Sequence, residues 1–388
     1  MFAVHSFDPY LLIPAGTGEE AESTIRFFRR HQPQATNFPC SYQKDFLPFR
    51  IRNVQGQPSD SKALFLQTIC PAINILSVYN AYERMITRNL TSVILFFLQA
   101  LFCNGHSHAQ APAGVQSYLE TIDIRTGKRT VVYSTAGLLE SPNWSKDGRY
   151  LLYNKQGRLY RYWLSDRITD ELPFDSSLPA NNDHGFSPDG SQLAISAGDG
   201  SSHIYTASAE GGPLRQLTGQ SPSYWHGWSP DGKTLAFAGQ RNGDFDIYTI
   251  PADGGPEKRL TREKGLDDGP DYSPDGQYIY FNSYRTGRMQ IWRMKADGSD
   301  PEQLTDDRYA NWFPHPSPNG NQVVFLSFTE DQQQEHPFGR NVQLRLLDIV
   351  SQTVRDLTPV FFGGQGTINV PSWSPDGRRL AFVSYRIP

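Results

Sequence analysis

Two histidines stand at matching places in a repeated sequence phrase where four other copies carry proline. His184 and His226 each precede the serine of their copy by three residues, and the two copies are adjacent in the chain. An imidazole can bind a metal ion or exchange a proton near pH 7, and a proline ring can do neither. The pair therefore marks a candidate site for metal binding or acid–base chemistry.

Further polar residues stand at the same level of other copies or in the segments between them. Their carboxylates, amides and imidazoles could bind hydrogen-bonding groups of a ligand or complete a metal site. The candidate ligand-binding set is Glu140, Asp183, His184, His226, Asp267, Asp268, Asn311, His315, His336, Gln365 and Asn369. The candidate metal ligands are His184, His226 and His315, and no catalytic residue is assigned.

Each member of this set also has a structural interpretation. A histidine at the start of an inner strand can cap backbone groups or bond to a neighbouring unit, and Asp267-Asp268 can be ordinary turn residues. Trp225 and Trp312 suit packing better than sugar stacking. No motif requires a cofactor. The one cofactor that these residues could hold is a divalent metal ion such as Mn²⁺, Zn²⁺ or Ca²⁺.

The repeated phrase defines the elements that position these side chains. Its copies are NWSKDGRYLLY, GFSPDGSQLAI, GWSPDGKTLAF, DYSPDGQYIYF, HPSPNGNQVVF and SWSPDGRRLAF, at steps of 42, 42, 44, 44 and 57 residues. Ser-Pro-Asp-Gly fits a type I turn, and an alternating apolar strand follows it. A period in the low forties is the size of a four-stranded propeller blade.

The ends of this region predict how the ring closes. The last copy stops at Ser384-Tyr385-Arg386 after two strands, and residues 118–123 and 129–133 supply the missing pair. We therefore predict an all-β fold over residues 112–388, a six-bladed β-propeller of four-stranded blades whose last blade is closed by the N-terminal strands. Such closure leaves no free sheet edge between the first and last blades.

The candidate site then falls at one mouth of the central channel. His184 and His226 begin innermost strands at the end opposite the Ser-Pro-Asp-Gly turn. The longest step between copies contains a polar insertion, residues 330–338, and a glycine-rich run, residues 361–369. A polar loop beside a polar channel mouth is typical of a ligand site.

The N-terminal part of the chain has a different pattern. Residues 85–111 have the charged start, short apolar run and Ala-Gln-Ala end of a signal peptide. This pattern predicts a periplasmic or secreted protein with no transmembrane segment in its mature form. Residues 1–84 show no repeat, and we interpret them as a spurious or unstructured N-terminal extension. All three cysteines precede residue 112, so the propeller has no disulfide.

The phrases, together with outer strands such as Gln216-Leu217-Thr218, resemble the TolB-type propeller family of the bacterial envelope. The resemblance covers nearly all of residues 112–388 and implies a six-bladed propeller that binds other molecules. TolB proteins carry a separate α/β domain before the propeller, and nothing in this sequence matches it. Oligogalacturonate lyases are similar propellers that hold a divalent metal with channel histidines.

Two functions follow as hypotheses. The first is an exported module that binds an envelope protein or a glycan at the channel mouth. The alternative is a metal-dependent enzyme resembling the oligouronide lyases, with His184 and His226 as ligands. The net charge of −4 gives no basic face for nucleic acid, and no sequence feature indicates more than a monomer.

Overall fold

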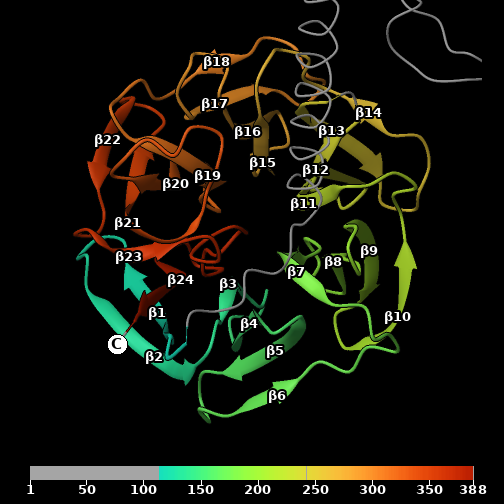
Figure 1. The fold of residues 1–388 in the computed structure, drawn as a ribbon, viewed down its shortest axis with the longest axis vertical. Helices are drawn as coiled ribbons and strands as arrows, with labels where there is room; N and C mark the ends of the chain where they lie inside the picture. The colour runs from blue at the N-terminus through green and yellow to red at the C-terminus, as the bar shows by residue number, and fades with distance from the viewer. Residues whose placement is uncertain (1–112, 242, 388) are drawn as a thin grey trace, which may run out of the picture. The chain divides into compact units, whose positions relative to one another are not determined.

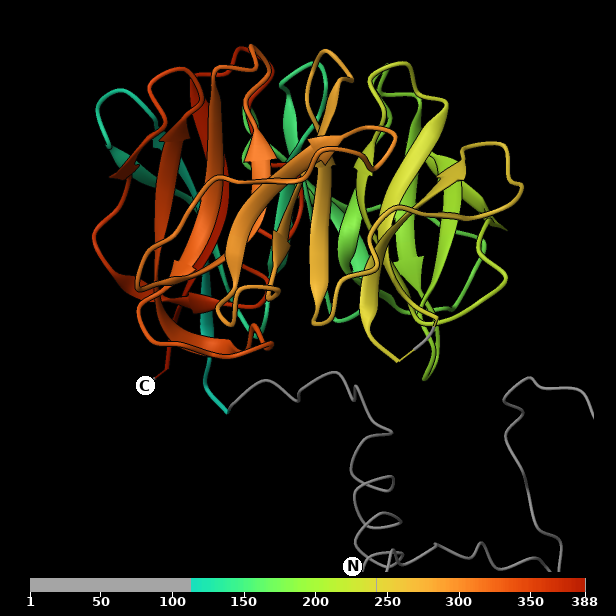
Figure 2. The same ribbon diagram turned by 90° about the horizontal axis from the view of Figure 1, so that it is seen from above.

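Six β-sheets stand around a common centre in the computed structural model, which describes residues 113–241 and 243–387 (Figure 1). All regular elements in this part of the chain are strands, and the loops gather at the two ends of the ring (Figure 2). The predicted all-β, six-bladed propeller is confirmed. The predictions for residues 1–84 and 85–111 fall outside the described residues.

The blades are numbered here in chain order, and blade 6 contains both chain ends. Blade 1 comprises β3 (Glu140–Trp144), β4 (Tyr150–Lys155), β5 (Arg158–Trp163) and β6 (Thr169–Glu171). Blade 2 comprises β7 (Ala180–Phe186), β8 (Gln192–Ala197), β9 (His203–Ser208) and β10 (Gly211–Gln216). Blade 3 comprises β11 (Ser223–Trp228), β12 (Thr234–Gln240), β13 (Phe245–Pro251) and β14 (Lys258–Arg259).

Blade 4 comprises β15 (Asp267–Tyr272), β16 (Tyr278–Ser283), β17 (Gln290–Lys295) and β18 (Glu302–Gln303). Blade 5 comprises β19 (Ala310–Pro316), β20 (Gln322–Phe328), β21 (Phe338–Asp348), β22 (Thr353–Asp356) and β23 (Phe361–Gly364). Blade 6 comprises β24 (Arg379–Arg386), β1 (Gln116–Asp123) and β2 (Arg129–Ala136).

Each Ser-Pro-Asp-Gly phrase forms a turn that is held by its own residues. In blade 2, the Ser187 hydroxyl donates to the Asp189 carboxylate at 2.6 Å and accepts the Gln192 N–H at 3.0 Å. The Gly190 N–H donates to the Ser187 carbonyl at 2.9 Å. The bond from Ser187, together with bonds from the Ser191 N–H and hydroxyl, lowers the pKa of Asp189 to about 2. Because every partner lies within five residues, the phrase encodes the turn locally.

The turns also contact one another around the ring. A Cβ atom added to Gly232 would lie 3.8 Å from the Pro188 ring of the preceding phrase. A Cβ atom added to Gly148 would lie 3.8 Å from the Pro375 ring of the last phrase. The second residue of each phrase therefore packs against the glycine of the next, and blade 6 leads back to blade 1. This neighbour relation supports closure of the ring at the turn end.

The two ends of the chain close the last blade by strand pairing. Strand β1 pairs antiparallel with β24 over eight residue pairs, from Gln116–Arg386 to Asp123–Arg379, and with β2 on its other side. Leu119 of β1 is fully buried opposite Val383. The predicted closure by the N-terminal strands is confirmed.

Aromatic side chains link neighbouring blades near the channel. The Trp228 indole N–H of blade 3 donates to the Gly185 carbonyl of blade 2 at 3.2 Å. The Trp373 indole N–H of blade 6 donates to the His315 carbonyl of blade 5 at 2.9 Å. Trp225 and Trp312 are at most 1% exposed and belong to apolar clusters. Their predicted packing role agrees with this burial.

Blades 5 and 6 depart from the repeat. Blade 5 has a fifth strand, β23, which pairs with β21 and follows the polar insertion in the chain. Blade 6 lacks a regular innermost strand, because only an isolated bridge joins Trp373 to Leu380. In residues 113–241 and 243–387, no helix is long and apolar enough to cross a membrane.

Candidate functional site at the channel mouth

Inner strands of the first five blades share an irregularity at the level of the candidate site. The pairing register with the second strand shifts in each, for example between Glu140 and Asn143 and between Asp268 and Asp271. Such bulges interrupt the ladder and redirect side chains, and they are common beside functional sites. The residues at these register shifts differ in type from one copy of the phrase to the next.

A segment of blade 6 reaches inward toward the centre of the ring, as the red chain near β23 shows in Figure 1. Strand β24 bonds to Thr367 on one side of this segment and to Ser372 on the other, so residues 368–371 leave the sheet. We call residues 368–371 the channel segment. Ile368 and Val370 are fully buried and join apolar clusters on different sides of the ring.

Side chains from three other blades bond to the backbone of the channel segment. Asn143 of blade 1 donates to the Pro371 carbonyl at 2.7 Å. His226 of blade 3 places Nδ1 3.2 Å from the Asn369 carbonyl oxygen, and His315 of blade 5 places Nε2 3.0 Å from that of Ile368. These bonds satisfy carbonyl groups that left the sheet.

His226 also forms an ion pair at the mouth. Its Nε2 lies 3.1 Å from Oδ1 of Asp268 in blade 4, and Oδ2 of the same carboxylate lies 3.7 Å from Nε2 of His336. Burial alone would lower the pKa of His226, but Asp268 and Asp183 outweigh it and raise the pKa to about 9. Burial would raise the pKa of Asp268, but the two histidines hold it below its usual value. His226 is therefore a cation at neutral pH.

Glu140 and Asp183 are two further carboxyl groups at the mouth, called here the acidic pair because the charge of Asp183 acts on Glu140. Burial and, to a smaller extent, the charge of Asp183 raise the pKa of Glu140 to about 7, although a hydrogen bond from Asn182 acts in the opposite direction. Burial also raises the pKa of Asp183 to about 7, with His226 opposing and Asp268 adding to the shift. No lysine or arginine forms an ion pair with either carboxyl group within residues 113–241 and 243–387.

The glycine-rich run completes the mouth. The Asn369 side chain accepts the Gly366 N–H at 2.9 Å and donates to the Gln365 side chain at 3.1 Å. His336 bonds to the same Gln365 side chain. A Cβ on Gly366 would lie 2.7 Å from Cγ of Glu140, so only glycine fits beside the acidic pair. The insertion and the run thus meet at the mouth, as expected for a loop beside a site.

The structure brings seven of the eleven predicted residues together at the mouth: Glu140, Asp183, His226, Asp268, His336, Gln365 and Asn369.

The other four predicted residues lie in separate arrangements. Asp267 forms an ion pair with Arg285 at 3.0 Å, and Asn311 is fully buried among hydrogen-bond partners in blades 4 and 5. His315 lies against Asp271 at 3.1 Å. His184 is fully buried, which lowers its pKa to about 3, and neither ring nitrogen has a well-aligned hydrogen bond within the described part of the chain.

The metal prediction meets a constraint in this geometry. Both ring nitrogens of His226 and of His315 have hydrogen-bonding partners, so a metal would have to displace the carbonyl of Asn369 or Ile368 or a carboxylate. Among the residues that the structure describes, no three His, Cys, Asp or Glu side chains are grouped to hold a metal ion. Metal binding by His184, His226 and His315 stays a prediction.

The predicted set omitted several residues at the mouth, among them Asn182, Tyr224 and Gly366. The charges of Asp183 and Asp268 act on Tyr224, and burial followed by these charges raises its pKa to about 12. A sequence signal could have found it, because Tyr224 stands five residues before its phrase serine, as Glu140 and Asp268 do. This column across the six copies reads Glu140, Asn182, Tyr224, Asp268, Trp312 and Asn369.

Known proteins share this fold and much of this sequence. The TolB β-propeller domain family matches residues 225–367. An uncharacterized protein of Agrobacterium fabrum is 50% identical over 278 residues, which are 71% of this chain and 94% of that protein. The chain belongs to the TolB-type β-propeller family. The predicted resemblance is therefore confirmed.

Two further TolB relatives differ in how much of their length is shared. A solved structure from Agrobacterium tumefaciens, provisionally described as TolB, has a TM-score of 0.68 and 49% identity over 71% of this chain and 100% of that one. The Tol-Pal system protein TolB of Anaeromyxobacter dehalogenans is 33% identical over 105 residues, which are 26% of this chain and 24% of that protein. Membership of the TolB family establishes the propeller fold. The function depends on the residues at the channel mouth, because one fold can carry many functions.

Proposed function

We propose that this TolB-type propeller is an exported binding module whose channel mouth receives a basic side chain of an envelope protein. The observation that carries the proposal is the acidic pair of Glu140 and Asp183, which has no lysine or arginine partner within residues 113–241 and 243–387. Asp183 is buried and Glu140 is half-buried. A carboxylate withdrawn from water without a cation is costly, and an incoming ammonium or guanidinium group would offset that cost.

The chemistry of the pair favours a cation over an anion or a neutral ligand. Both carboxyl groups have pKa values raised to about 7, so each is partly protonated at neutral pH. A bound cation stabilises the ionised form, so binding would release protons. His226 is the positive charge that acts on Asp183, and Asp268 already pairs with it at 3.1 Å.

The channel segment supports binding at the mouth and not through the ring. Residues 368–371 cross the centre and are bonded there by three blades. A partner would therefore insert one or two side chains beside Gln365 and Tyr224. Binding through a few anchoring side chains in a desolvated site is typical of protein interfaces.

Export and the envelope location rest on the signal-peptide pattern of residues 85–111 and on family membership. N-terminal sequencing of the exported protein tests them, and we expect a mature N-terminus close to residue 112. A mature protein that retains residues before Met85 would contradict this interpretation.

The test of the mouth uses short peptides that contain one lysine or one arginine, and the same peptides with acetyl-lysine or citrulline. Calorimetry at pH 7 in two buffers of different ionisation enthalpy measures affinity and proton release together. We expect binding of the charged peptides, proton release, and an affinity that increases as the pH rises through 7.

Two variants make this test specific. Asp183→Asn removes one carboxylate, and we expect a loss of affinity of about tenfold. Asp199→Asn changes an exposed acid in the loop after β8 and should bind as the parent does. Equal affinity for charged and neutral peptides, or an unchanged affinity in Asp183→Asn, would reject the proposal. The metal-dependent lyase has no observation in its favour at the mouth and is tested separately through its metal.

A further inference from the structure

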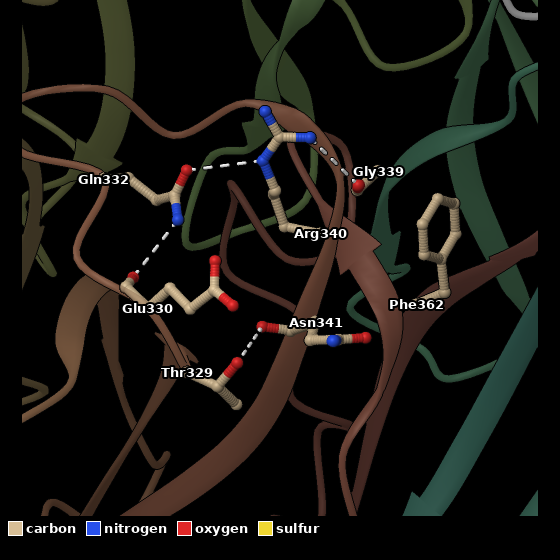
Figure 3. A pocket seen from close by; sticks show the side chains of 7 residues that line it. All are labelled: Thr329, Glu330, Gln332, Gly339, Arg340, Asn341 and Phe362. Atoms are coloured by element: carbon tan, nitrogen blue, oxygen red, sulfur yellow. Dashed lines mark hydrogen bonds between the residues drawn. The ribbon is translucent and has the colours of Figure 1, made fainter.

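A second candidate site lies outside the channel, between the polar insertion of blade 5 and strands β21 and β23. A pocket of about 130 Å³ opens there, and Glu330, Gln332, Gly339, Arg340, Asn341 and Phe362 line it. Figure 3 shows these side chains around one space. Ligand pockets for drug-sized molecules are larger, so this space suits one small ring and not an extended chain.

The extra strand of blade 5 builds the pocket. Asn341 of β21 and Phe362 of β23 are paired directly across the ladder, so their side chains leave the sheet on the same face. The register shifts between Phe338 and Arg340, which places a bulge at Gly339. A Cβ on Gly339 would lie only 3.1 Å from the Phe362 ring, so the glycine lets the ring approach the backbone.

The polar side chains of the pocket are partly fixed and partly unused. The Gln332 amide donates to the Glu330 carbonyl at 3.2 Å and accepts from Arg340 at 3.4 Å. The Glu330 carboxylate and the Asn341 side-chain amide have no hydrogen-bond or ion-pair partner within the described part of the chain. Figure 3 shows the carboxylate extending into the space below Arg340 and the amide extending toward Phe362.

We propose that this pocket binds a single neutral pyranose ring, such as glucose or N-acetylglucosamine. Four planar polar groups, one carboxylate, one guanidinium and two amides, can each bond to neighbouring hydroxyl groups of a sugar. The Phe362 ring supplies an apolar surface for the C–H face of the pyranose. This combination matches a ring that is polar at its rim and apolar on its face.

The exposure of the charged groups argues against an amino acid as the ligand. Glu330 and Arg340 are both exposed and form no ion pair with each other. Exposed charges contribute little to binding a zwitterion, because water screens them. Hydrogen bonds with several planar side chains do not depend on net charge, so they favour a neutral ligand with many hydroxyl groups.

The polar insertion contributes residues both to this pocket and to the channel mouth, but different residues to each. Gln334 accepts the Leu266 N–H of blade 4 at 2.9 Å, and His336 lies 3.7 Å from Asp268. Glu330 and Gln332 belong to the same insertion but line the pocket. A sugar in the pocket and a basic side chain at the mouth would therefore use different residues, and the two proposals can fail independently.

The experiment measures saturation-transfer NMR and calorimetry on the full chain with glucose, N-acetylglucosamine and glycine as probes. We expect saturable millimolar binding of at least one sugar and none of glycine. Glu330→Gln and Asn341→Ala change exposed side chains and should weaken sugar binding about tenfold. Glu335→Gln, an exposed acid of the same insertion outside the pocket, should leave the affinity unchanged.

A mouth variant, Asp183→Asn, serves as the second control and should also bind the sugar as the parent does. Absence of saturable sugar binding in the folded parent would overturn the proposal. It would equally fail if glycine bound in place of the sugars, or if Glu330→Gln and Asn341→Ala both kept the parental affinity.

Discussion

The imidazole Nε2 of His226 lies 3.1 Å from the carboxylate Oδ1 of Asp268, and both side chains are buried at the channel mouth. They come from adjacent blades, so their pairing also joins two sheets. His226 then reaches the Asn369 carbonyl with its other nitrogen at 3.2 Å. One side chain thus links blades 3 and 4 to the channel segment of blade 6.

The pH dependence of stability should reveal this pair. The pKa of His226 rises from 6.5 to about 9 in the folded protein, so its contribution is full below about pH 6.5 and is lost as the pH rises through 9. We expect denaturant titrations to give a lower free energy of unfolding at pH 9.5 than at pH 6.5. His226→Gln should cost about 3 kcal/mol at pH 6.5 and show less of this decline.

His203→Gln is the matched control, because that ring bonds to the Thr218 carbonyl and not to a carboxylate. This variant should keep the parental difference between pH 6.5 and 9.5. A parental decline that persists unchanged in His226→Gln would show that other groups cause it.

The fit of Gly366 beside the acidic pair can be tested by adding one methyl group. In Gly366→Ala, the new Cβ would lie 2.5 Å from the Tyr385 hydroxyl oxygen and 2.7 Å from Cγ of Glu140, at a φ of +85°. We expect a loss of about 2–3 kcal/mol in the free energy of unfolding, from backbone strain together with steric overlap. Calorimetric melting measures the change.

Gly137→Ala separates the two causes, because Gly137 has a φ of +82° but no atom within 4 Å of the added Cβ. We expect it to cost about 1 kcal/mol from strain alone. Equal losses in the two variants would mean that the contacts with Tyr385 and Glu140 contribute nothing.

Closure of blade 6 should depend on the packing of β1. Leu119 is fully buried, so Leu119→Ala is expected to lower the free energy of unfolding by about 2–5 kcal/mol. Val131 on the neighbouring β2 is 52% exposed, and Val131→Ala should change stability by less than about 0.5 kcal/mol. Similar small effects in both variants would indicate that β1 is not required to hold the ring closed.

Elemental analysis tests the metal hypothesis and the lyase alternative that depends on it. Because the ring nitrogens of His226 and His315 are already bonded, we expect substoichiometric metal in untagged protein after incubation with Mn²⁺, Zn²⁺ or Ca²⁺. A stoichiometric ion that disappears in a His184→Ala/His226→Ala variant would reverse this expectation, and assays with oligouronides would follow.

The sequence by itself determined the blades, their number and the closure of the ring. Ser187, Asp189 and Gly190 form a turn through bonds that span no more than five residues, so the same letters recur wherever the turn recurs. The unfinished last copy and the strands near Leu119 complete each other because an open sheet edge is unfavourable. Turns held by local hydrogen bonds, and a fixed repeat length, can be inferred from the sequence without coordinates.

Only the tertiary structure decided which polar residues meet. His184 and His226 occupy the same column, yet His184 is buried without a well-aligned partner in the described residues and His226 pairs with Asp268. The difference arises because the channel segment crosses the ring near His226, and its path depends on blade 6 leaving its own sheet. Contacts between residues as far apart as His226 and Asn369 depend on the whole ring, and no short sequence pattern encodes them.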